Sequence, residues 1–180
     1  GLVYPVFPGE YSASLGGNVA TNAGGMRAVK YGVTRHHVIG LEAVLPSGEV
    51  IQCGGKVVKV STGYDLTQLV VGSEGTLALV TKAFLKLYPR SPHQATVLAP
   101  FTSLEAVTAA VPETVRSGVG PLSLECIDML TTAAAADHPL FSRRNRTARA
   151  APVTETAVPV IRTARGRLGS LRKAFPISRQ

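Results

Sequence analysis

The feature that most restricts the fold is a run of small residues near the start of the chain, PGEYSASLGGNVATNAGG at positions 8–25. Only one bulky aliphatic residue lies between Gly9 and Gly17. Small side chains leave main-chain N–H groups accessible, and glycine adopts positive φ without steric penalty, so such a segment can surround a pyrophosphate without a lysine. A glycine-rich crossover in a β-rich fold explains the composition equally well, because neither GxxxxGK[ST] nor GxGxxG is present.

The positive charge of the 180-residue chain is concentrated at its C-terminal end. The formal net charge is +8, yet residues 1–130 contain nine Lys or Arg and nine Asp or Glu, whereas residues 131–180 contain ten basic and two acidic residues. Phe141 and Phe175 are the aromatic residues of this tail, and no motif that reads a nucleic-acid groove is present. Salt-sensitive, non-specific association with nucleic acid is the most that the tail suggests.

The hydrophobic pattern changes where the charge does, near residues 131–142. Beyond this point Ala, Arg, Thr and Pro mix with little helical or strand periodicity, and three prolines interrupt any long element. We therefore expect residues 131–180 to form an Arg/Ala/Pro-rich tail of weak order. The chain begins with Gly1 in strand-like sequence, which suggests a piece of a longer protein.

The first part of the chain shows a hairpin followed by a helix, a tight loop and a strand. Two apolar runs, residues 38–45 and 49–53, flank Pro-Ser-Gly, which supplies the turn. Residues 64–71 have the apolar spacing of a short helix, with Asp65 as its N-cap. Gly72–Gly75 then breaks the helix before the β-rich residues 76–87.

A second domain is expected to begin after Pro89 and Pro92. Residues 94–101 are predicted to form a strand, residues 103–117 a helix capped by Thr102 or Ser103, and residues 121–127 another strand, which gives a βαβ-like unit. The fold class predicted from these patterns is α+β.

Other chemistries have little support in the sequence. Cys53 and Cys126 belong to no metal-spaced cluster, and we expect both to be free, buried thiols. His36 and His37 are adjacent and cannot both lie on one strand face, so no metal site is expected, and Ser73 lacks a GxSxG elbow. The chain has no apolar run of about 20 residues and no signal-peptide pattern, so the expected location is cytoplasmic, without a membrane span.

The order of the motifs is more specific than their composition. PGxxxxxxGGNVATNAGG is followed by Lys-Tyr-Gly at 30–32, Gly-Gly-Lys at 54–56, Gly-Tyr-Asp-Leu at 63–66 and Gly-Ser-Glu-Gly-Thr-Leu at 72–77. This series resembles the FAD-linked oxidases of the vanillyl-alcohol oxidase type, with an FAD-binding domain of the PCMH type. Within them it is most similar to the group of glycolate oxidase, D-lactate dehydrogenase and D-2-hydroxyglutarate dehydrogenase. The resemblance covers residue 1 to about residue 129.

The resemblance implies a division into three parts. Residues 1–90 correspond to the second subdomain of the FAD-binding domain, and residues 91–130 to the start of an α+β cap domain, the C-terminal domain of FAD-linked oxidases. Residues 131–180 match neither, as a shifted reading frame would explain. The family's first FAD subdomain, with an RGGGTS-like loop, and most of the cap have no counterpart, so the chain resembles a fragment and its catalytic residues stay unassigned.

The resemblance also assigns cofactor contacts to individual residues. The first group meets the flavin's diphosphate and ring side, the second lines the ribityl and pyrophosphate region, and the third contacts the adenosine half. In this order the groups are Pro8, Gly9, Ser12 and Ser14, which the further cofactor-binding residues Gly16, Gly17 and Asn18 follow; Thr21, Asn22, Ala23 and Gly24; and Glu74, Gly75, Thr76 and Val80. Ala78 stands where the family usually has glycine, which matters only if this residue has positive φ or touches the cofactor.

The implied function is dehydrogenation of a 2-hydroxy acid such as D-lactate or glycolate, by hydride transfer to the flavin. The electron acceptor is not identified by any residue. A partner subunit or further chain segments are expected to complete the FAD site. Two alternatives stay open at this point: an inactive remnant without flavin, and a protein that binds nucleic acid through its basic tail.

Overall fold

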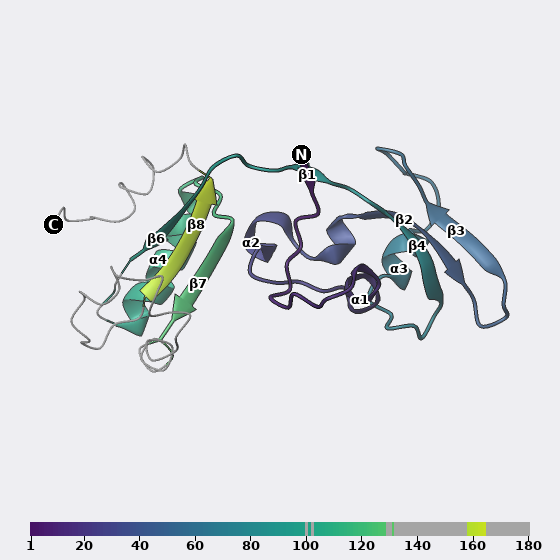
Figure 1. Ribbon diagram of the computed structural model, residues 1–180, viewed down its shortest axis with the longest axis horizontal. Coiled ribbons are helices and arrows are strands. Elements are labelled where there is room, and N and C mark those ends of the chain that lie inside the picture. The colour runs from purple at the N-terminus through teal and green to yellow at the C-terminus, as the bar shows by residue number, and fades with distance from the viewer. Residues whose placement is uncertain (100, 102, 129–130, 132–157, 165–180) are drawn as a thin grey trace. The chain divides into compact units, whose positions relative to one another are not determined.

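The computed structural model describes residues 1–99, 101, 103–128, 131 and 158–164 (Figure 1). The chain divides into two compact units, unit 1 from Gly1 to Ser91 and unit 2 from Pro92 to Gln180. Unit 1 contains a three-stranded and a two-stranded sheet, and unit 2 contains a three-stranded sheet. No helix among the described residues is long and apolar enough to cross a bilayer.

Unit 1 is built on a three-stranded antiparallel sheet of order β3-β2-β4. Its strands are β2 (Val38–Val44), β3 (Val50–Gly54) and β4 (Leu79–Leu85). The predicted hairpin is confirmed: β2 and β3 pair directly, and Gly48 takes a φ of +85° in the turn between them. The residues before Leu79 are not in the strand, so β4 is shorter than the strand predicted over 76–87.

Short helices connect the strands of unit 1. They are α1 (Leu15–Thr21), α2 (Ala28–Tyr31), the 3-10 helix η1 (Thr34–His36) and α3 (Leu66–Val70). A small second sheet pairs β1 (Leu2–Val3) with β5 (Tyr88–Pro89). Asp65 accepts a hydrogen bond from Gln68 N, which confirms the predicted cap of α3.

The core of unit 1 joins α1 and α3 to the sheet. Val19 of α1, Leu41 and Ala43 of β2, and Val70 of α3 are all buried in one cluster. Ala78, with 4% of its surface exposed, belongs to the same cluster and does not have a positive φ. Its methyl group therefore packs in the core, and the departure from the family's glycine causes no backbone strain.

The sequence had suggested one continuous loop for the glycine-rich segment, but part of this segment is helical. Residues 15–21 form α1, because Ser14 accepts a hydrogen bond from Gly17 N at the helix start and Asn22 ends the helix in the left-handed conformation. Two glycines lower the intrinsic helix propensity of this segment. Capping and the packing of Val19 outweigh that loss.

Unit 2 contains the predicted strand, helix and strand. These are β6 (Gln94–Leu98), α4 (Leu104–Arg116) and β7 (Ser123–Ile127), and Ser103 caps the helix by accepting from Ala106 N. The sheet order is β6-β8-β7, with β8 (Val158–Ala164) antiparallel to both neighbours. β6 and β7 are therefore parallel to each other and separated by β8.

Two expectations for the second half of the chain were wrong. Weak order was expected throughout the tail, yet residues 158–164 form the central strand of this sheet, because pairing with β6 and β7 supplies partners that are distant in the sequence. Cys126, expected to be buried, is exposed on β7, whereas Cys53 is buried. Apart from Thr131, the remaining tail residues, including His138, lie outside the described residues.

Candidate functional site

The structure brings together the two glycine-containing segments that the sequence had singled out. At the C-terminal end of α1, the carbonyl of Val19 accepts from Gly72 N at 3.0 Å, and that of Ala20 accepts from Glu74 N at 2.9 Å. A Cβ added to Gly72, whose φ is +85°, would lie 2.9 Å from the Cβ of Asn22. Segment 72–76 is therefore fixed against α1 by two main-chain hydrogen bonds, and its close approach to Asn22 needs glycine at position 72.

The start of α1 is open to solvent. Ser12, Ser14, Gly16 and Gly17 are all exposed. The N–H of Gly17 is held by the Ser14 side chain, but those of Leu15 and Gly16 precede the first helical hydrogen bond and have no partner within the described part of the chain. A Cβ added to Gly16 would meet nothing within 4 Å. This surface can receive a ligand close to the backbone.

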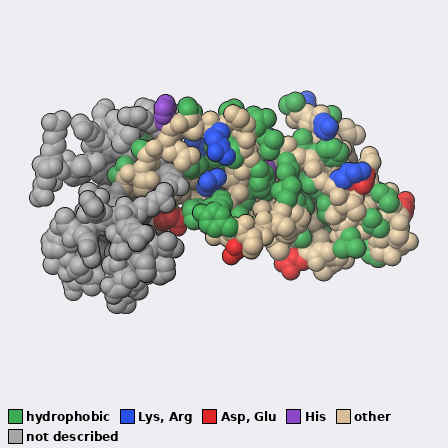
Figure 2. Space-filling model, in the orientation of Figure 1, with side chains coloured by type: hydrophobic (Ala, Val, Ile, Leu, Met, Phe, Trp, Pro, Cys, Tyr) green, Lys and Arg blue, Asp and Glu red, His purple; other side chains and the backbone are tan. Residues whose placement is uncertain are grey.

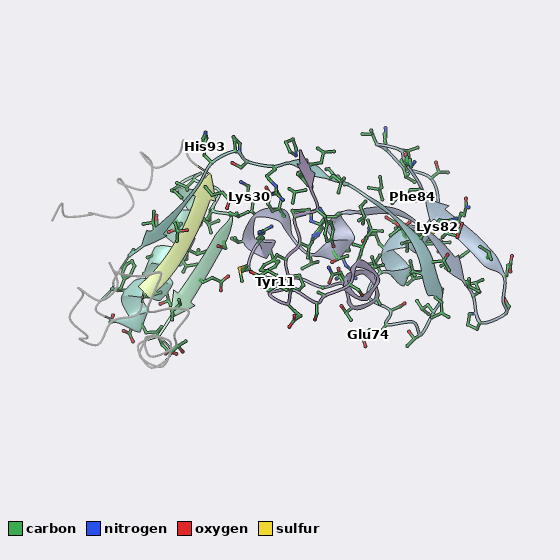
Figure 3. All side chains as sticks on the ribbon, viewed as in Figure 1. Tyr11, Lys30, Glu74, Lys82, Phe84 and His93 are labelled. Carbon is green, nitrogen blue, oxygen red and sulfur yellow. The ribbon has the colours of Figure 1, made fainter. Side chains whose placement is uncertain are left out.

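The turn at residues 73–76 presents a second exposed surface. Ser73 accepts hydrogen bonds from both the N–H and the hydroxyl of Thr76, at 3.0 and 2.6 Å. Glu74 and Gly75 have φ of +52° and +80°, and Glu74 is one of two non-glycine residues with positive φ among those described. Its exposed carboxylate can accept hydrogen bonds, for example from ribose hydroxyls. Figure 3 shows Glu74 and Tyr11 along the lower edge of unit 1.

Other predicted site residues make hydrogen bonds that stabilise the fold around α1. Asn18 is buried, and its side chain, like that of Thr34, bonds the phenol of Tyr4, whose pKa is nevertheless raised by burial. Asn22 accepts from Arg35 N through its side chain at 2.9 Å. The carbonyl of Ala23 accepts both the N–H and the hydroxyl of Thr34.

Val80 lies on β4 opposite Ala43 of β2 and packs, half-buried, against the core of unit 1. The register shifts beside this pair, at a bulge where Thr81 donates to the carbonyl of Glu42 at 3.2 Å.

The residues predicted to bind the cofactor fall into an exposed set and a less exposed set. Exposed are Gly9, Ser12, Ser14, Gly16, Gly17, Thr21, Glu74, Gly75 and Thr76, whereas Pro8, Asn18, Asn22, Ala23, Gly24 and Val80 are half-buried or buried.

Arg35 is a supporting residue that sequence reasoning missed. Its guanidinium donates to the carbonyl of Val71 at 3.3 Å, and its own carbonyl accepts from the Gln68 side chain at 2.9 Å. Together with the bond from its N–H to Asn22, these contacts tie η1 to α3 and to the end of α1. No local sequence pattern signals such a role, because the partners lie far apart in the chain.

The donors at this site fit a neutral or anionic group better than a metal ion. Main-chain N–H groups and serine hydroxyls border open space at the start of α1, as contact with a phosphate requires. Within the described residues, no three His, Cys, Asp or Glu side chains come together as metal ligands. The residues present therefore fit a phosphate-containing cofactor such as FAD.

Comparisons with known proteins agree with the expected family. The family described as FAD binding domain matches residues 1–54, and the family described as FAD linked oxidases, C-terminal domain, matches residues 90–174. The second match includes β8 and continues through most of the tail that the sequence analysis had placed outside the family. The two matches confirm FAD as the predicted cofactor.

Several curated proteins are similar over most of this chain. An uncharacterised FAD-linked oxidoreductase of Mycobacterium tuberculosis is 64% identical over 134 residues, 74% of this chain and 29% of that protein. A D-lactate dehydrogenase of Anaerostipes hadrus is 47% identical over 71% of this chain and 27% of its own length. The glycolate oxidase subunit GlcD of Bacillus subtilis is 46% identical over 73% and 28%. The matched segment thus spans less than a third of each relative.

A solved structure of alkyldihydroxyacetonephosphate synthase shares the fold, with a TM-score of 0.75 over 97% of this chain and 36% of that protein. The sequence identity is 19%, so the likeness concerns the fold alone.

Proposed function

Because the chain belongs to the FAD-linked oxidases, we propose that it forms part of an oxidoreductase that dehydrogenates a 2-hydroxy acid such as D-lactate or glycolate. Similarity to proteins named D-lactate dehydrogenase and glycolate oxidase supports this substrate class. The observation that carries the proposal is the junction of α1 with residues 72–76, through the bonds from Gly72 N and Glu74 N. Both segments predicted to bind the cofactor belong to one folded unit, which supports the proposal.

In this proposal the exposed residues at the start of α1 bind the diphosphate region of FAD. The N–H groups of Leu15 and Gly16 donate to phosphate oxygens, and the hydroxyl of Ser12 lies in the same exposed segment. Glu74 and Thr76 bind the adenosine half, while Asn18, Asn22 and Ala23 hold this surface in shape. FAD, when bound, supplies the acceptor for the hydride of the substrate.

Substrate binding and proton removal require groups beyond those described. The catalytic residues stay unassigned within the described part of the chain. We propose that the rest of the protein, or a partner subunit, completes the site and provides them. The electron acceptor is likewise a property of the whole protein.

The two alternatives have weaker support. The nucleic-acid hypothesis rests on the basic tail, yet the FAD-linked oxidase C-terminal family matches the chain up to residue 174, well into this tail. The flavin-free remnant rests on the first FAD subdomain that has no counterpart in this sequence, whereas the glycines and hydroxyls of the surface formed by α1 and residues 72–76 are present and favour flavin binding.

The direct test is the absorption spectrum of the purified chain before and after incubation with FAD and desalting. Bands near roughly 370 and 450 nm, where oxidised flavins absorb, are expected to persist after desalting. Bleaching by D-lactate or glycolate, measured with the completing segments or partner subunit present, would then test the substrate class. A folded protein that retains no flavin would contradict the proposal for this chain.

Gly16→Ala separates cofactor binding from folding. The added methyl group meets no protein atom within 4 Å and replaces a helical glycine, so we expect a gain in stability of about 0.5–1 kcal/mol. The same methyl group would occupy space that a phosphate must approach, so flavin retention should fall. Thermal unfolding and flavin absorbance measure the two effects, and unchanged retention would remove Gly16 from the site.

A further inference from the structure

Arg27 is a cation held in a fixed position beside the glycine-rich segment. Its guanidinium carbon lies 5.3 Å from the ring centre of Phe7, and the Phe7 ring makes an edge contact with Tyr11, with ring centres 5.5 Å apart. Tyr11 is 93% exposed. The three side chains form a cluster, here called the Arg27 cluster, at the start of the segment that leads to α1.

The backbone around Arg27 is held as tightly as its side chain. Gly25 packs so close to the chain before the glycine-rich segment that an added Cβ would lie 1.9 Å from the carbonyl oxygen of Phe7. The carbonyl of Arg27 accepts from the N–H groups of Lys30 and Tyr31, both at 3.1 Å. Arg27 therefore keeps its place relative to Phe7 and Pro8.

The charge of Arg27 is not neutralised within the described residues. The ion pairs there join Lys82 to Glu42 and Arg116 to Glu113. Glu10 is the only acidic residue before position 42, and its carboxylate accepts from both the N–H and the hydroxyl of Ser12. These bonds lower the pKa of Glu10, so its carboxylate stays charged. Its hydrogen-bond partner belongs to the same loop rather than to Arg27.

Stacking determines which part of the guanidinium stays available. A ring contact occupies one face of the planar group and leaves its in-plane N–H donors free for a second partner. Those donors match the oxygens of a carboxylate or phosphate. Lys30, exposed three residues later, lies with its ammonium 5.5 Å from the ring centre of Tyr31.

We propose that Arg27 is an oxyanion-binding residue at the edge of the FAD surface. The inference rests on the proposed function, which supplies two sources of this chemistry, the diphosphate of the cofactor and the carboxylate of the 2-hydroxy acid. In either case Phe7 orients the guanidinium, and the N–H donors of Arg27 bind the oxygens.

The test compares wild type with Arg27→Gln, Arg27→Lys and the control Lys56→Gln in the full chain. Lys56 is also a cation over an aromatic ring, 5.6 Å from the centre of Phe84, but it follows β3 rather than the glycine-rich segment. Binding of inorganic pyrophosphate and of D-lactate is measured separately by calorimetry. Arg27→Gln should weaken one of them about tenfold or more, with a smaller loss in Arg27→Lys and none in Lys56→Gln.

The ligand that loses affinity identifies the source: pyrophosphate indicates the cofactor, and D-lactate the substrate. Equal binding of both ligands by wild type and Arg27→Gln, or binding of neither by wild type, would overturn the proposal. Flavin retention is measured on the same proteins. If no variant retains FAD, the proposed function fails, while pyrophosphate and D-lactate still decide the role of Arg27.

Discussion

Individual glycines in unit 1 have different physical roles, although the sequence shows them as one composition. Gly16 borders open space, Gly25 and Gly72 allow close backbone packing, and Gly48 supplies a turn. Sequence reasoning identified the segment and its resemblance. It could not separate ligand contact from packing, because that distinction depends on what lies opposite each Cα in the fold.

Gly25→Ala tests the packing role. The new Cβ would lie 1.9 Å from the carbonyl oxygen of Phe7, at a φ of +151° that side chains rarely adopt. We expect a loss of about 3 kcal/mol or more in the free energy of unfolding, because backbone must move and strain adds to the clash. Chemical denaturation provides the measurement.

Gly48→Ala is the matched control, since its φ is +85° but its added Cβ would meet nothing within 4 Å. It should cost only about 1–2 kcal/mol, the penalty of the left-handed conformation alone. Similar losses in the two variants would show that the contact between Gly25 and Phe7 is not tight in solution.

At the level of elements, local signals predicted the hairpin, α3 and α4, because turn residues and caps act within a few positions. Asp65 and Ser103 are caps of this kind. α1 and β8 were missed because their stability depends on distant partners. α1 contains two glycines and is held by Gly72 and Glu74, while β8 contains Pro159 and pairs with strands about 30 or more residues away.

Ser14→Ala tests whether the cap of α1 supports the cofactor surface. Loss of the bond from Gly17 N to the Ser14 hydroxyl should cost about 1 kcal/mol and loosen the first turn of the helix. Flavin retention should therefore fall. Ser103→Ala removes the equivalent cap of α4, from Ala106 N, at a similar cost, and should leave flavin retention unchanged. Equal effects on retention would attribute them to general destabilisation.

Across the molecule, apolar side chains remain exposed in both units, as Figure 2 shows for one face. Leu79 and Val50 of the first sheet and Leu104 of α4 are all more than half exposed. The matched segment spans 29% of the relative from M. tuberculosis. Prolines predicted a boundary near residue 90, beside the point where the two compact units divide, whereas the charge boundary near residue 131 lies inside the second family match, which extends to residue 174.

The stability of unit 1 as a whole should depend on pH through His37. This side chain is fully buried and contacts Tyr4 near the N-terminus and Tyr88 of β5 by ring edges, with centres 6.0 and 5.5 Å apart. Burial lowers its pKa, against the opposing effect of the Tyr31 carbonyl, and the charges of His36 and Lys86 lower it further. The folded state therefore holds the neutral imidazole, while the unfolded chain binds a proton near pH 6.5.

Because the unfolded state takes up the proton first, stability is highest above about pH 6.5 and decreases as the pH falls below it. The slope attributable to His37 is at most about 1.4 kcal/mol per pH unit. His37→Phe keeps an aromatic ring between the two tyrosines and removes the titrating group. Its free energy of unfolding, measured by urea denaturation from pH 8 to 5, should decrease less steeply than that of wild type. Parallel profiles would mean that His37 is protonated equally in both states, and that acid acts on unit 1 through its carboxylates instead.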